Sequence, residues 1–581
     1  MSEKSVRLRI LVGAMLMGLA MAGLGSQVAY LHLGPHEEVL QKISRTREYE
    51  KTILAGRGRV LDCNGTGNIL ALNLSVKNVC VDPFVITQSR KTDEVASGLT
   101  MALPTRSRGE IASLIESRPE KRFARVEHYL PEERARRIGM LGLPGVFFED
   151  AIIRYYPQKD FMCHVLGFVN YEGTGSAGVE LALDSLLKGK AGLIRAPVDA
   201  RRREVRSRRG SDVPPEAGAD IMLTLDQNIQ YIVEKALDEA VAEYHPRGAW
   251  AIVQRVRTGE ILAMASRPSF DPNEFREASQ EMMRNRAIGD VYEPGSTLKA
   301  ITIASAIEAG TVTPNTTFNC ENGCWYYKGR PLRDHGSGYG VLTVADGLKK
   351  SSNVLAAKVA LTLGDARFEQ CLRAFGIGSK LGLDLQGEEA GILHPAKRWS
   401  GLDATRIAIG QSVSATALQV LGVYCAIAND GYLMRPYVVS HCVSEDGTVL
   451  KRTQPQVLSR PISARTAATM RMLLARVTEE GGTGTRGAIE GFKVAGKTGT
   501  AQKPENGGYS ATRYIASFVG FVPAEDPQIG VIVVVDEPRG ERYYGGQVAA
   551  PVFARIGGQT LRYLDVNPGQ DVTAPSVALR R

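Results

Sequence analysis

The chain has 581 residues, which is enough for more than one domain and for sizeable hydrophobic cores. Apolar residues make up 44% and charged residues 23% of it, a composition that excludes a disordered or low-complexity chain. The net charge of +9 permits anionic partners such as phospholipid or wall polymers. Because no zinc-finger spacing or nucleic-acid module accompanies that charge, we expect no nucleic acid among the partners.

The N-terminal segment predicts a membrane anchor. A basic flank within residues 1–9 comes first: Lys4, Arg7 and Arg9. Residues 10–33 then hold no Asp, Glu, Lys or Arg, which is long enough to span about 30 Å of hydrocarbon as a helix. We expect a cytoplasmic tail over 1–9, a transmembrane helix over 10–33 and the remainder outside. The alternative is a cleaved signal peptide, because Ala20-Met-Ala22 is similar to a cleavage site, although the apolar run continues past it.

Small residues recur every four positions in this helix, at Ala14, Gly18, Ala22 and Ser26. They would form one ridge, against which another membrane helix can pack closely. The alternative is that Gly and Ala are simply frequent in membrane helices.

Residues 34–220, called the pedestal below, hold no catalytic pattern. Two apolar stretches around an Asn-Gly turn, Arg57–Gly65 and Ile69–Ala71, predict a hairpin. Residues 88–145 alternate charged helical segments with short breaks, and the lone His164 is interpreted as structural rather than as a ligand. The basic run of residues 201–209 is interpreted as a solvated strand face. A stretch rich in Pro and Gly, residues 211–220, marks a domain boundary.

Residues 221–566 predict one α+β domain, an antiparallel sheet with helices on each side. The domain opens with a helix that runs to about His245-Pro246 and has a predominantly helical middle. A hairpin follows that first helix: Trp250–Val256 and Glu260–Met264. Three further strands and a closing helix are expected near the end: Phe492–Thr498, Ser517–Phe521, Ile529–Val535 and Gln547–Tyr563. The polar tail, residues 567–581, is expected to be disordered.

One stretch of this domain carries an activated-nucleophile pattern. Ser296 and Lys299 stand three residues apart in the first turn of a predicted helix that Gly310 ends. Residues three apart share a helical face, so the amine of Lys299 can reach the hydroxyl of Ser296. The spacing alone is weak, because Ser185 and Lys188 repeat it by chance.

The context makes the pattern specific. Ser351-Ser-Asn353 is the only Ser-x-Asn in the chain, and Lys497-Thr498-Gly499 is the only Lys-Thr-Gly. Ordered Ser-x-x-Lys, Ser-x-Asn and Lys-Thr-Gly are the signature of the penicillin-recognising acyl-serine enzymes.

The eight cysteines are scattered, and no His or Cys pair at ligand spacing completes a zinc site. Only Cys320 and Cys324 are close in sequence. A disulfide between them and two free thiols are both compatible with the sequence, since short loops constrain disulfide geometry. We expect no metal and no organic cofactor.

From the anchor to Ile556 the chain resembles a class B penicillin-binding protein, a monofunctional transpeptidase of bacterial wall synthesis. Three groups of residues are similar to the family's pedestal motifs: Arg57-Gly58 with Asp62, Arg154 with Tyr156-Pro157, and Gly178-Val-Glu180. Cys63 departs from the family, which has a basic residue there, and the hairpin is two residues longer. Glu293-Pro294, Val535–Pro538 and Tyr544–Gly546 resemble the division-specific branch most, with elongation-type and sporulation-type relatives as alternatives.

The resemblance implies the penicillin-binding transpeptidase fold and an acyl-serine mechanism on peptides that end in D-Ala-D-Ala. Ser296 would be the nucleophile and Lys299 the base, while Ser351 would relay a proton and Asn353 would bind the substrate amide and Lys299. The substrate-binding residues would be Lys497, Thr498, Gly499 and Thr500, with an oxyanion hole from the backbone N–H groups of Ser296 and Thr500.

The resemblance further implies peptidoglycan stem peptides and β-lactams as ligands, and a membrane-embedded glycan polymerase and division proteins as partners. The catalytic domain would lie outside the inner membrane, in the periplasm or extracytoplasmic space. A class A enzyme is rejected because its glycosyltransferase motif does not follow Glu149-Asp150. A β-lactamase or D,D-carboxypeptidase that passes the acyl group to water, and a scaffold or β-lactam sensor, are the remaining alternatives.

Overall fold

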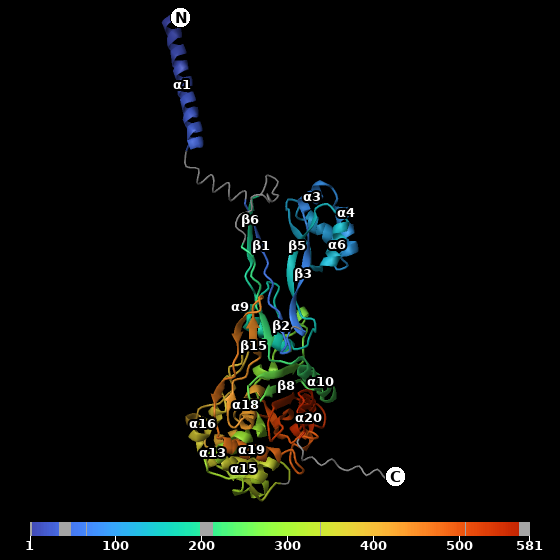
Figure 1. Ribbon diagram of the computed structural model, residues 1–581, viewed down its shortest axis with the longest axis vertical. Coiled ribbons are helices and arrows are strands. Elements are labelled where there is room, and N and C mark those ends of the chain that lie inside the picture. Colours follow the sequence, from blue (N-terminus) through green and yellow to red (C-terminus); the bar gives the residue numbers. More distant parts are fainter. Residues whose placement is uncertain are drawn as a thin grey trace. The chain divides into compact units, whose positions relative to one another are not determined.

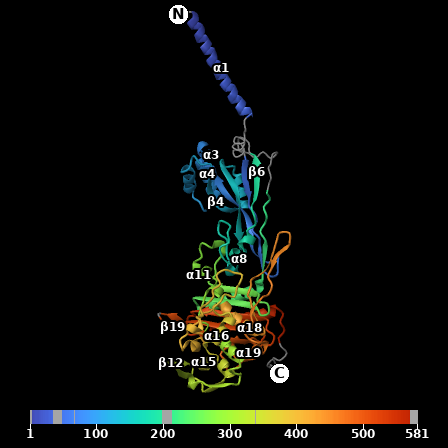
Figure 2. The same cartoon turned by 90° about the vertical axis from the view of Figure 1, so that its left-hand side faces the viewer.

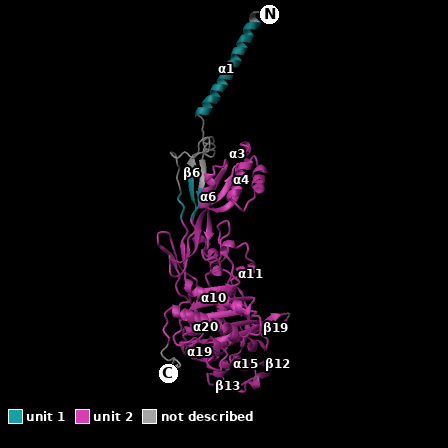
Figure 3. Cartoon of the chain, turned by 90° about the vertical axis from the view of Figure 1, so that its right-hand side faces the viewer, with its two compact units in different colours: residues 1–55, 190–216 teal, residues 56–189, 217–581 magenta. Residues whose placement is uncertain are grey.

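The computed structural model describes residues 3–33, 48–65, 67–197, 213–336, 338–505 and 507–568 (Figure 1). The chain divides into two compact units (Figure 3). One unit comprises Met1–Ala55 and Lys190–Glu216, and the other comprises Gly56–Gly189 and Ala217–Arg581. Two predictions lie outside the described residues, namely the basic strand face at 201–209 and the tail beyond residue 568.

The first unit contains the predicted membrane helix. Helix α1 spans Glu3–Leu33, and Ser5–His32 within it is long and apolar enough to cross a membrane. Because α1 begins at Glu3, the basic flank belongs to the same helix as the apolar stretch. The unit also holds a two-stranded antiparallel sheet, in which β1 (Glu48–Ile53) pairs with β6 (Gly192–Pro197).

The predicted pedestal hairpin is confirmed. Strand β2 (Val60–Leu61) pairs antiparallel with β3 (Ile69–Val81) across the Asn-Gly turn. The carboxylate of Asp62 stabilises the turn by accepting hydrogen bonds from the backbone N–H of Asn64 at 2.9 Å and from Asn68 Nδ2 at 2.8 Å. Strand β3 continues well beyond the predicted Ala71 and pairs with both β4 and β5.

The prediction that the charged segments of residues 88–145 are helical is wrong for one segment, residues 124–131, which forms a strand. Strand β4 (Ala124–Pro131) lies in this range, and its buried residues Ala124, Val126 and Leu130 follow the period of two that a half-buried strand requires. Charged residues between them, such as Arg125, concealed that alternation. The other elements of this part are α3 (Pro83–Gln88), α4 (Thr92–Ala102), α5 (Arg108–Glu116), α6 (Glu132–Met140) and β5 (Val146–Tyr155).

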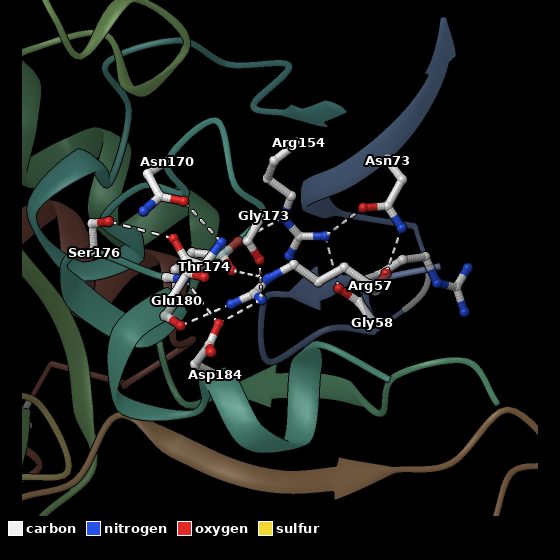
Figure 4. Close-up of polar contacts among 12 residues, drawn as sticks. Arg57, Gly58, Asn73, Arg154, Asn170, Gly173, Thr174, Ser176, Glu180 and Asp184 are labelled. Carbon is white, nitrogen blue, oxygen red and sulfur yellow. Dashed lines mark hydrogen bonds and ion pairs between the residues drawn. The ribbon is translucent and has the colours of Figure 1, made fainter. Parts of the chain in front are cut away.

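The three pedestal motifs meet in one buried ion-pair network, drawn in Figure 4. Arg57 Nε and Arg154 Nε each lie 2.6 Å from one carboxylate oxygen of Glu180, which has no exposed side-chain surface. Arg57 Nη1 also pairs with Asp184 at 2.7 Å, and Arg154 Nη1 donates to the carbonyl oxygen of Gly58 at 2.8 Å. The network joins β5 to the residues before β2 and to two short helices, α8 (Gly178–Ala182) and α9 (Asp184–Leu187). The short helix α7 (Cys163–Leu166) precedes them in the chain.

His164, in α7, is buried as expected of a structural residue. Its Nε2 lies 2.8 Å from the carbonyl oxygen of Met282, and burial lowers the pKa of the imidazole to about 4. The side chain is therefore neutral at physiological pH.

The predicted antiparallel sheet of the second half is confirmed. Five strands follow the order β18-β19-β20-β8-β9, and every neighbouring pair is antiparallel. Their bounds are Ala495–Glu505, Gly508–Val522, Ile529–Asp536, Gly248–Arg255 and Ile261–Arg267, in that order. Figure 2 shows these strands together with α18 (Ala417–Ala428) and α19 (Ala464–Ala475), two helices that pack against the sheet.

Helices cover both faces of this sheet. On one face α10 (Gln227–Tyr244) and α20 (Gly545–Tyr563) share a core with alternate strand residues such as Val533 and Phe518. On the other face α18 (Ala417–Ala428), which is buried along its whole length, packs with α13 (Lys299–Glu308). The predicted first and closing helices are thus confirmed as α10 and α20, and the sheet separates them from the helical middle.

The helical middle connects β9 to β18. Its helices are η2 (Pro272–Glu274), α11 (Gln280–Met283), α12 (Arg286–Gly289), η3 (Gly295–Leu298), α13, η4 (Glu321–Gly323), α14 (Val344–Lys350), α15 (Asn353–Leu361), α16 (Asp365–Ala374), η5 (Ala396–Arg398), α17 (Asp403–Ile407), α18, α19 (Ala464–Ala475) and η6 (Thr485–Gly487). Its strands are β10 (Thr317–Asn319), β11 (Cys324–Tyr327), β12 (Arg330–Arg333), β13 (Val341–Thr343), β14 (Leu433–Met434), β15 (Val439–Val443), β16 (Val449–Arg452) and β17 (Val457–Ser459).

A further strand, β7 (Asp220–Leu223), begins at the predicted boundary between residues 220 and 221. It pairs in parallel with β2 and antiparallel with β15, within a seven-stranded sheet. That sheet therefore contains strands from both sides of the boundary at residue 220. The division of the chain into tail, membrane helix, pedestal, transpeptidase domain and C-terminal tail remains a prediction.

Candidate active site

Ser296 lies at the junction of two helices. The 3-10 turn η3 carries it, and α13 begins at Lys299, so the predicted single helix has a tighter first turn. Gly295 has a φ of +57°, and a Cβ there would approach the carbonyl oxygen of Thr500 to 3.3 Å. Glycine at this position lets the backbone turn tightly against β18, with Ser296 half-buried beside it.

Lys299 is fully buried, and its ammonium group contacts the Ser-x-Asn motif. Its Nζ donates to the carbonyl oxygen of Ser351 at 2.6 Å, to Asn353 Oδ1 at 2.7 Å and to Ser351 Oγ at 3.2 Å. Over the described part of the chain, no hydrogen bond joins Lys299 Nζ to Ser296 Oγ. The predicted contact between Lys299 and Asn353 is therefore present. Among the described residues, the predicted direct contact between Lys299 and Ser296 is absent.

Ser351 occupies a sharp corner between α14 and α15. Its backbone is left-handed, with φ of 60° and ψ of 38°, which ends one helix directly before the next. Ser351 Oγ lies 3.2 Å from Lys299 Nζ and 2.9 Å from Lys497 Nζ. The hydroxyl therefore bridges two lysines that are far apart in sequence.

Asp334 holds this corner in place, and the sequence offered no signal for it. Its carboxylate accepts hydrogen bonds from Asn353 N at 2.6 Å, Val354 N at 3.0 Å and Ser352 Oγ at 3.0 Å. The two N–H groups belong to the first turn of α15 and have no partner within the helix, and Ser352 is the N-cap residue of that helix. A lone Asp in a loop has no spacing that would reveal this role.

The Lys-Thr-Gly motif and Thr500 lie on β18, at the edge of the sheet. Lys497 is fully buried, and Thr498 Oγ1 lies 3.0 Å from Thr483 Oγ1. A Cβ on Gly499 would come within 2.3 Å of Ser517 Oγ and 2.9 Å of Thr297 Cγ2, so no side chain fits there. Thr500 Oγ1 accepts a hydrogen bond from Gly545 N at 3.0 Å, which ties β18 to the start of α20.

Burial changes the acidity of both lysines. It lowers the pKa of Lys299 well below that of a free lysine, and the neighbouring Lys497 charge adds to the effect while Asp334 opposes it. Burial also lowers the pKa of Lys497 to about 7. The site thus holds one lysine that favours the neutral form and another that titrates near neutrality.

A cavity of about 400 Å³ opens beside Ser296. Its lining includes Gly295, Ser296, Leu332, Arg333, His335, Asn353, Arg406, Gln411, Thr500, Gln502, Tyr514, Tyr543 and Tyr544. Three tyrosines stack in series on one wall, with ring centroids 4.3 Å apart for Tyr514 and Tyr543 and 4.4 Å apart for Tyr543 and Tyr544. A larger cavity of about 700 Å³ is lined by none of the eight predicted site residues.

Several of these lining residues come from short elements or loops that are distant in sequence, which is why residue spacing missed Arg333 in β12, His335 and Arg406 in α17. Burial, together with the charges of Lys299 and Lys497, lowers the pKa of His335, while Asp334 opposes the shift. Among the lining residues outside the three catalytic motifs, Tyr544 was singled out from the sequence, because it belongs to the stretch Tyr544–Gly546 that resembles the division-specific branch.

The open question of Cys320 and Cys324 has an answer in the structure, where both are free thiols. Cys320 is buried, and its Sγ lies 3.6 Å from Ser352 Oγ. Within the described ranges, no three His, Cys, Asp or Glu side chains gather closely enough to hold a metal ion.

Two family descriptions match the chain. Residues 52–223 match the "Penicillin-binding Protein dimerisation domain", and residues 249–557 match the "Penicillin binding protein transpeptidase domain". The second match covers the sheet and all eight predicted site residues.

Curated relatives match over most of their length. Stage V sporulation protein D of Bacillus subtilis is 35% identical over 88% of this chain and 79% of its own. The probable peptidoglycan D,D-transpeptidase PenA of Neisseria meningitidis is 33% identical over 98% of this chain and 95% of its own. The peptidoglycan D,D-transpeptidase FtsI of Escherichia coli is 30% identical over 97% of this chain and 93% of its own.

Solved structures are also similar. Penicillin binding protein 3 of Mycobacterium tuberculosis, complexed with aztreonam, has a TM-score of 0.69 and 27% identity over 89% of this chain and 98% of its own. A peptidoglycan synthetase from Bifidobacterium adolescentis has a TM-score of 0.72 over 91% of this chain and 99% of its own, and at 24% identity it supports the fold alone.

Proposed function

We propose, since the chain belongs to the class B penicillin-binding proteins, that it is a peptidoglycan D,D-transpeptidase that works through an acyl-serine intermediate. One observation carries the proposal. Lys299, from the Ser-x-x-Lys motif, donates hydrogen bonds to Ser351 and Asn353 of the second motif. Lys497, from the third motif, donates a hydrogen bond to Ser351 as well. Three separate segments thus form one connected network, and Asn353 of that network lines the same cavity as Ser296.

In the acylation step, Ser296 Oγ attacks the carbonyl carbon between the two terminal D-Ala residues of a stem peptide. The new Oγ–C bond replaces the C–N bond to the last D-Ala, which leaves as the free amino acid. Lys299 takes the proton of the hydroxyl as general base, because its lowered pKa keeps a neutral fraction available. Ser351 lies between the two lysines, where it can relay that proton to the departing nitrogen.

The remaining groups bind charge. Backbone N–H groups of Ser296 and Thr500 form the oxyanion hole, an assignment supported by the close approach of Gly295 to Thr500. Lys497, Thr498 and Thr500 bind the terminal carboxylate with a cation and hydroxyls, and Gly499 leaves room for β18 to pass close to Ser296. Asn353 binds the substrate amide and orients Lys299.

An amine from a neighbouring strand completes the reaction. Its nitrogen bonds to the acyl carbon, the Oγ–C bond breaks, and the proton lost by the amine returns to Ser296. Transfer to water instead would make the protein a D,D-carboxypeptidase. The pedestal and the membrane-length helix favour a transpeptidase that works beside growing strands.

The cellular setting belongs to the same proposal. The basic flank of α1 supports an N-terminus in the cytoplasm and a catalytic domain on the outer side of the inner membrane. A monofunctional transpeptidase needs a glycan polymerase nearby, and the relatives FtsI and PenA favour septal synthesis with division proteins as partners. A role in sporulation is the second candidate, supported by the relative named stage V sporulation protein D.

Fluorescent penicillin tests the nucleophile. The purified chain should bind one label covalently, and Ser296→Ala should abolish labelling. Ser185→Ala is the matched control, because Ser185 has the same spacing to a lysine but lies in α9, far along the chain from the site. Equal labelling of the two variants would show that Ser296 is not the nucleophile.

A further inference from the structure

The cavity beside Ser296 has an unbalanced charge. Arg333 and Arg406 line it, and none of its lining residues is Asp or Glu. His335 adds no lasting positive charge near neutral pH, since its pKa is lowered by burial and by the two lysines.

Neither arginine is neutralised by the protein. Within the described residues no carboxylate lies at ion-pair distance from Arg333 or Arg406, whereas Arg286 and Arg476 of the same half have carboxylate oxygens at 2.9 Å and 2.7 Å. Asp334, the neighbour of Arg333 in sequence, is occupied by the donors at the start of α15.

The two arginines are held near each other and near the reacting groups. Arg406 Nη2 donates to the carbonyl oxygen of Pro331 at 3.2 Å, and Pro331 stands two residues before Arg333 on β12. The carbonyl oxygen of Arg333 accepts a hydrogen bond from Asn353 Nδ2 at 2.8 Å. Both arginines and Asn353 therefore line the same cavity as Ser296.

Guanidinium groups without partners on a cavity wall favour a ligand that brings its own carboxylate. The terminal carboxylate of the donor is already assigned to Lys497, Thr498 and Thr500 on β18. We propose that the donor stem peptide carries a second free carboxylate, upstream of D-Ala-D-Ala, and that Arg333 and Arg406 bind it. This inference rests on the proposed function, and it names the class of stem peptide that the site prefers.

The test compares synthetic donors in acylation of the full-length chain in detergent. All donors end in D-Ala-D-Ala. One donor keeps both upstream carboxyl groups, which are the side-chain carboxyl of the third residue and the α-carboxyl of the γ-linked glutamate. In the other donors the first group, the second group or both are converted to the amide. For acylation of Ser296, kcat/KM should be about tenfold higher for a donor that keeps the carboxylate bound by the arginines than for the donor in which that group is an amide. The singly amidated donors show which carboxylate that is, and added salt should reduce the ratio.

Variants separate recognition from a structural role. Arg333→Gln and Arg406→Gln should bring the carboxylate-to-amide ratio close to one, chiefly by slowing the carboxylate donor. Arg398→Gln is the matched control, because Arg398 lines the neighbouring cavity of about 310 Å³ instead, and it should keep the ratio.

Two results would overturn the inference: equal rates for all donors in the parent chain, or Arg variants that slow both donors by the same factor. The proposed function would fail differently, because then no donor would acylate Ser296 at all.

Discussion

Two buried lysines share the hydroxyl of Ser351, and their opposing requirements are the central feature at the scale of single residues. As the proposed general base, Lys299 must be neutral to accept a proton, whereas Lys497, as the proposed ligand of the terminal carboxylate, must be charged. Burial lowers the pKa of both, which helps the first lysine and works against the second.

This conflict predicts a bell-shaped pH dependence for acylation by penicillin. The rate rises as Lys299 loses its proton, at a pH well below the pKa of a free lysine. It falls above a pH of about 7, where Lys497 loses its charge. Lys497→Arg should move the falling limb upward, because a guanidinium group stays charged throughout this range.

Stopped-flow or gel-based labelling from pH 5 to 10 measures both profiles. A falling limb at the same pH in the parent and in Lys497→Arg would show that Lys497 does not set it.

The residues that we propose to react were chosen from short motifs, but their contacts could not be predicted in this way. Ser296, Lys299, Ser351, Asn353 and Lys497 each follow from residue type and order. The partner of Lys299 does not, because an ammonium group donates to the strongest acceptors that the fold brings near, here the carbonyl of Ser351 and the amide of Asn353. Asp334 follows β12 in a loop, Arg333 ends that short strand and Arg406 lies in the short helix α17. None of the three belongs to a recognisable motif, so only the folded chain brings them to the site.

At the scale of elements, two kinds of apolar pattern predicted structure. The strands β8, β9 and β20 are short runs that are buried on both faces, and α10 and α20 each have an apolar face. Strand β4 was missed because Arg125 and other charged residues alternate with its buried positions and are common in helices too. The short pairing of β2 with β7 joins residues that are distant in sequence, and no local pattern reveals it.

The pedestal elements depend on one buried carboxylate. Glu180 neutralises Arg57 and Arg154, so Glu180→Gln would leave two buried guanidinium groups with Asp184 as their remaining acid. We expect a loss of about 3 kcal/mol in the free energy of unfolding of the pedestal, since breaking a buried ion pair leaves uncompensated charge.

Urea titration of the detergent-solubilised chain, followed by protease cleavage within the pedestal, measures this loss. Glu133→Gln is the control, because Glu133 pairs with Arg137 at 2.5 Å on the exposed surface of α6. The urea midpoint of this variant should equal that of the parent chain. Equal midpoints for Glu180→Gln and Glu133→Gln would contradict a stabilising role for the network.

At the scale of the whole molecule, the chain combines a membrane-length helix with a catalytic half built on two large hydrophobic cores, the larger of which also includes pedestal residues such as Val60 and Tyr156. This organisation predicts that the anchor selects partners and that the catalytic half acts on strands they supply. The ridge of Ala14, Gly18, Ala22 and Ser26 is the candidate contact with a polymerase.

Two leucines on that ridge test it. Gly18→Leu with Ala22→Leu should weaken co-purification with the membrane-embedded glycan polymerase, because bulk holds the two helices apart. Penicillin labelling should persist, since the site is far from α1 in the chain. Gly13→Leu with Ala20→Leu is the matched control, because at about 3.6 residues per turn those positions lie on the opposite face. If both pairs co-purify as well as the parent, the ridge is ordinary membrane-helix composition.

The central claim is that Ser296 carries the acyl group that an amine then accepts. The most direct measurement is mass spectrometry of the full-length chain after incubation with a D-Ala-D-Ala donor, with and without an amine acceptor. The tryptic peptide of residues 287–299 contains Ser296 as its only serine. We predict that this peptide gains the mass of the donor minus that of the released D-Ala, and that the acceptor removes this added mass while a cross-linked product appears. An acyl group on any other peptide, or release only as the hydrolysed donor when the acceptor is present, would contradict the account.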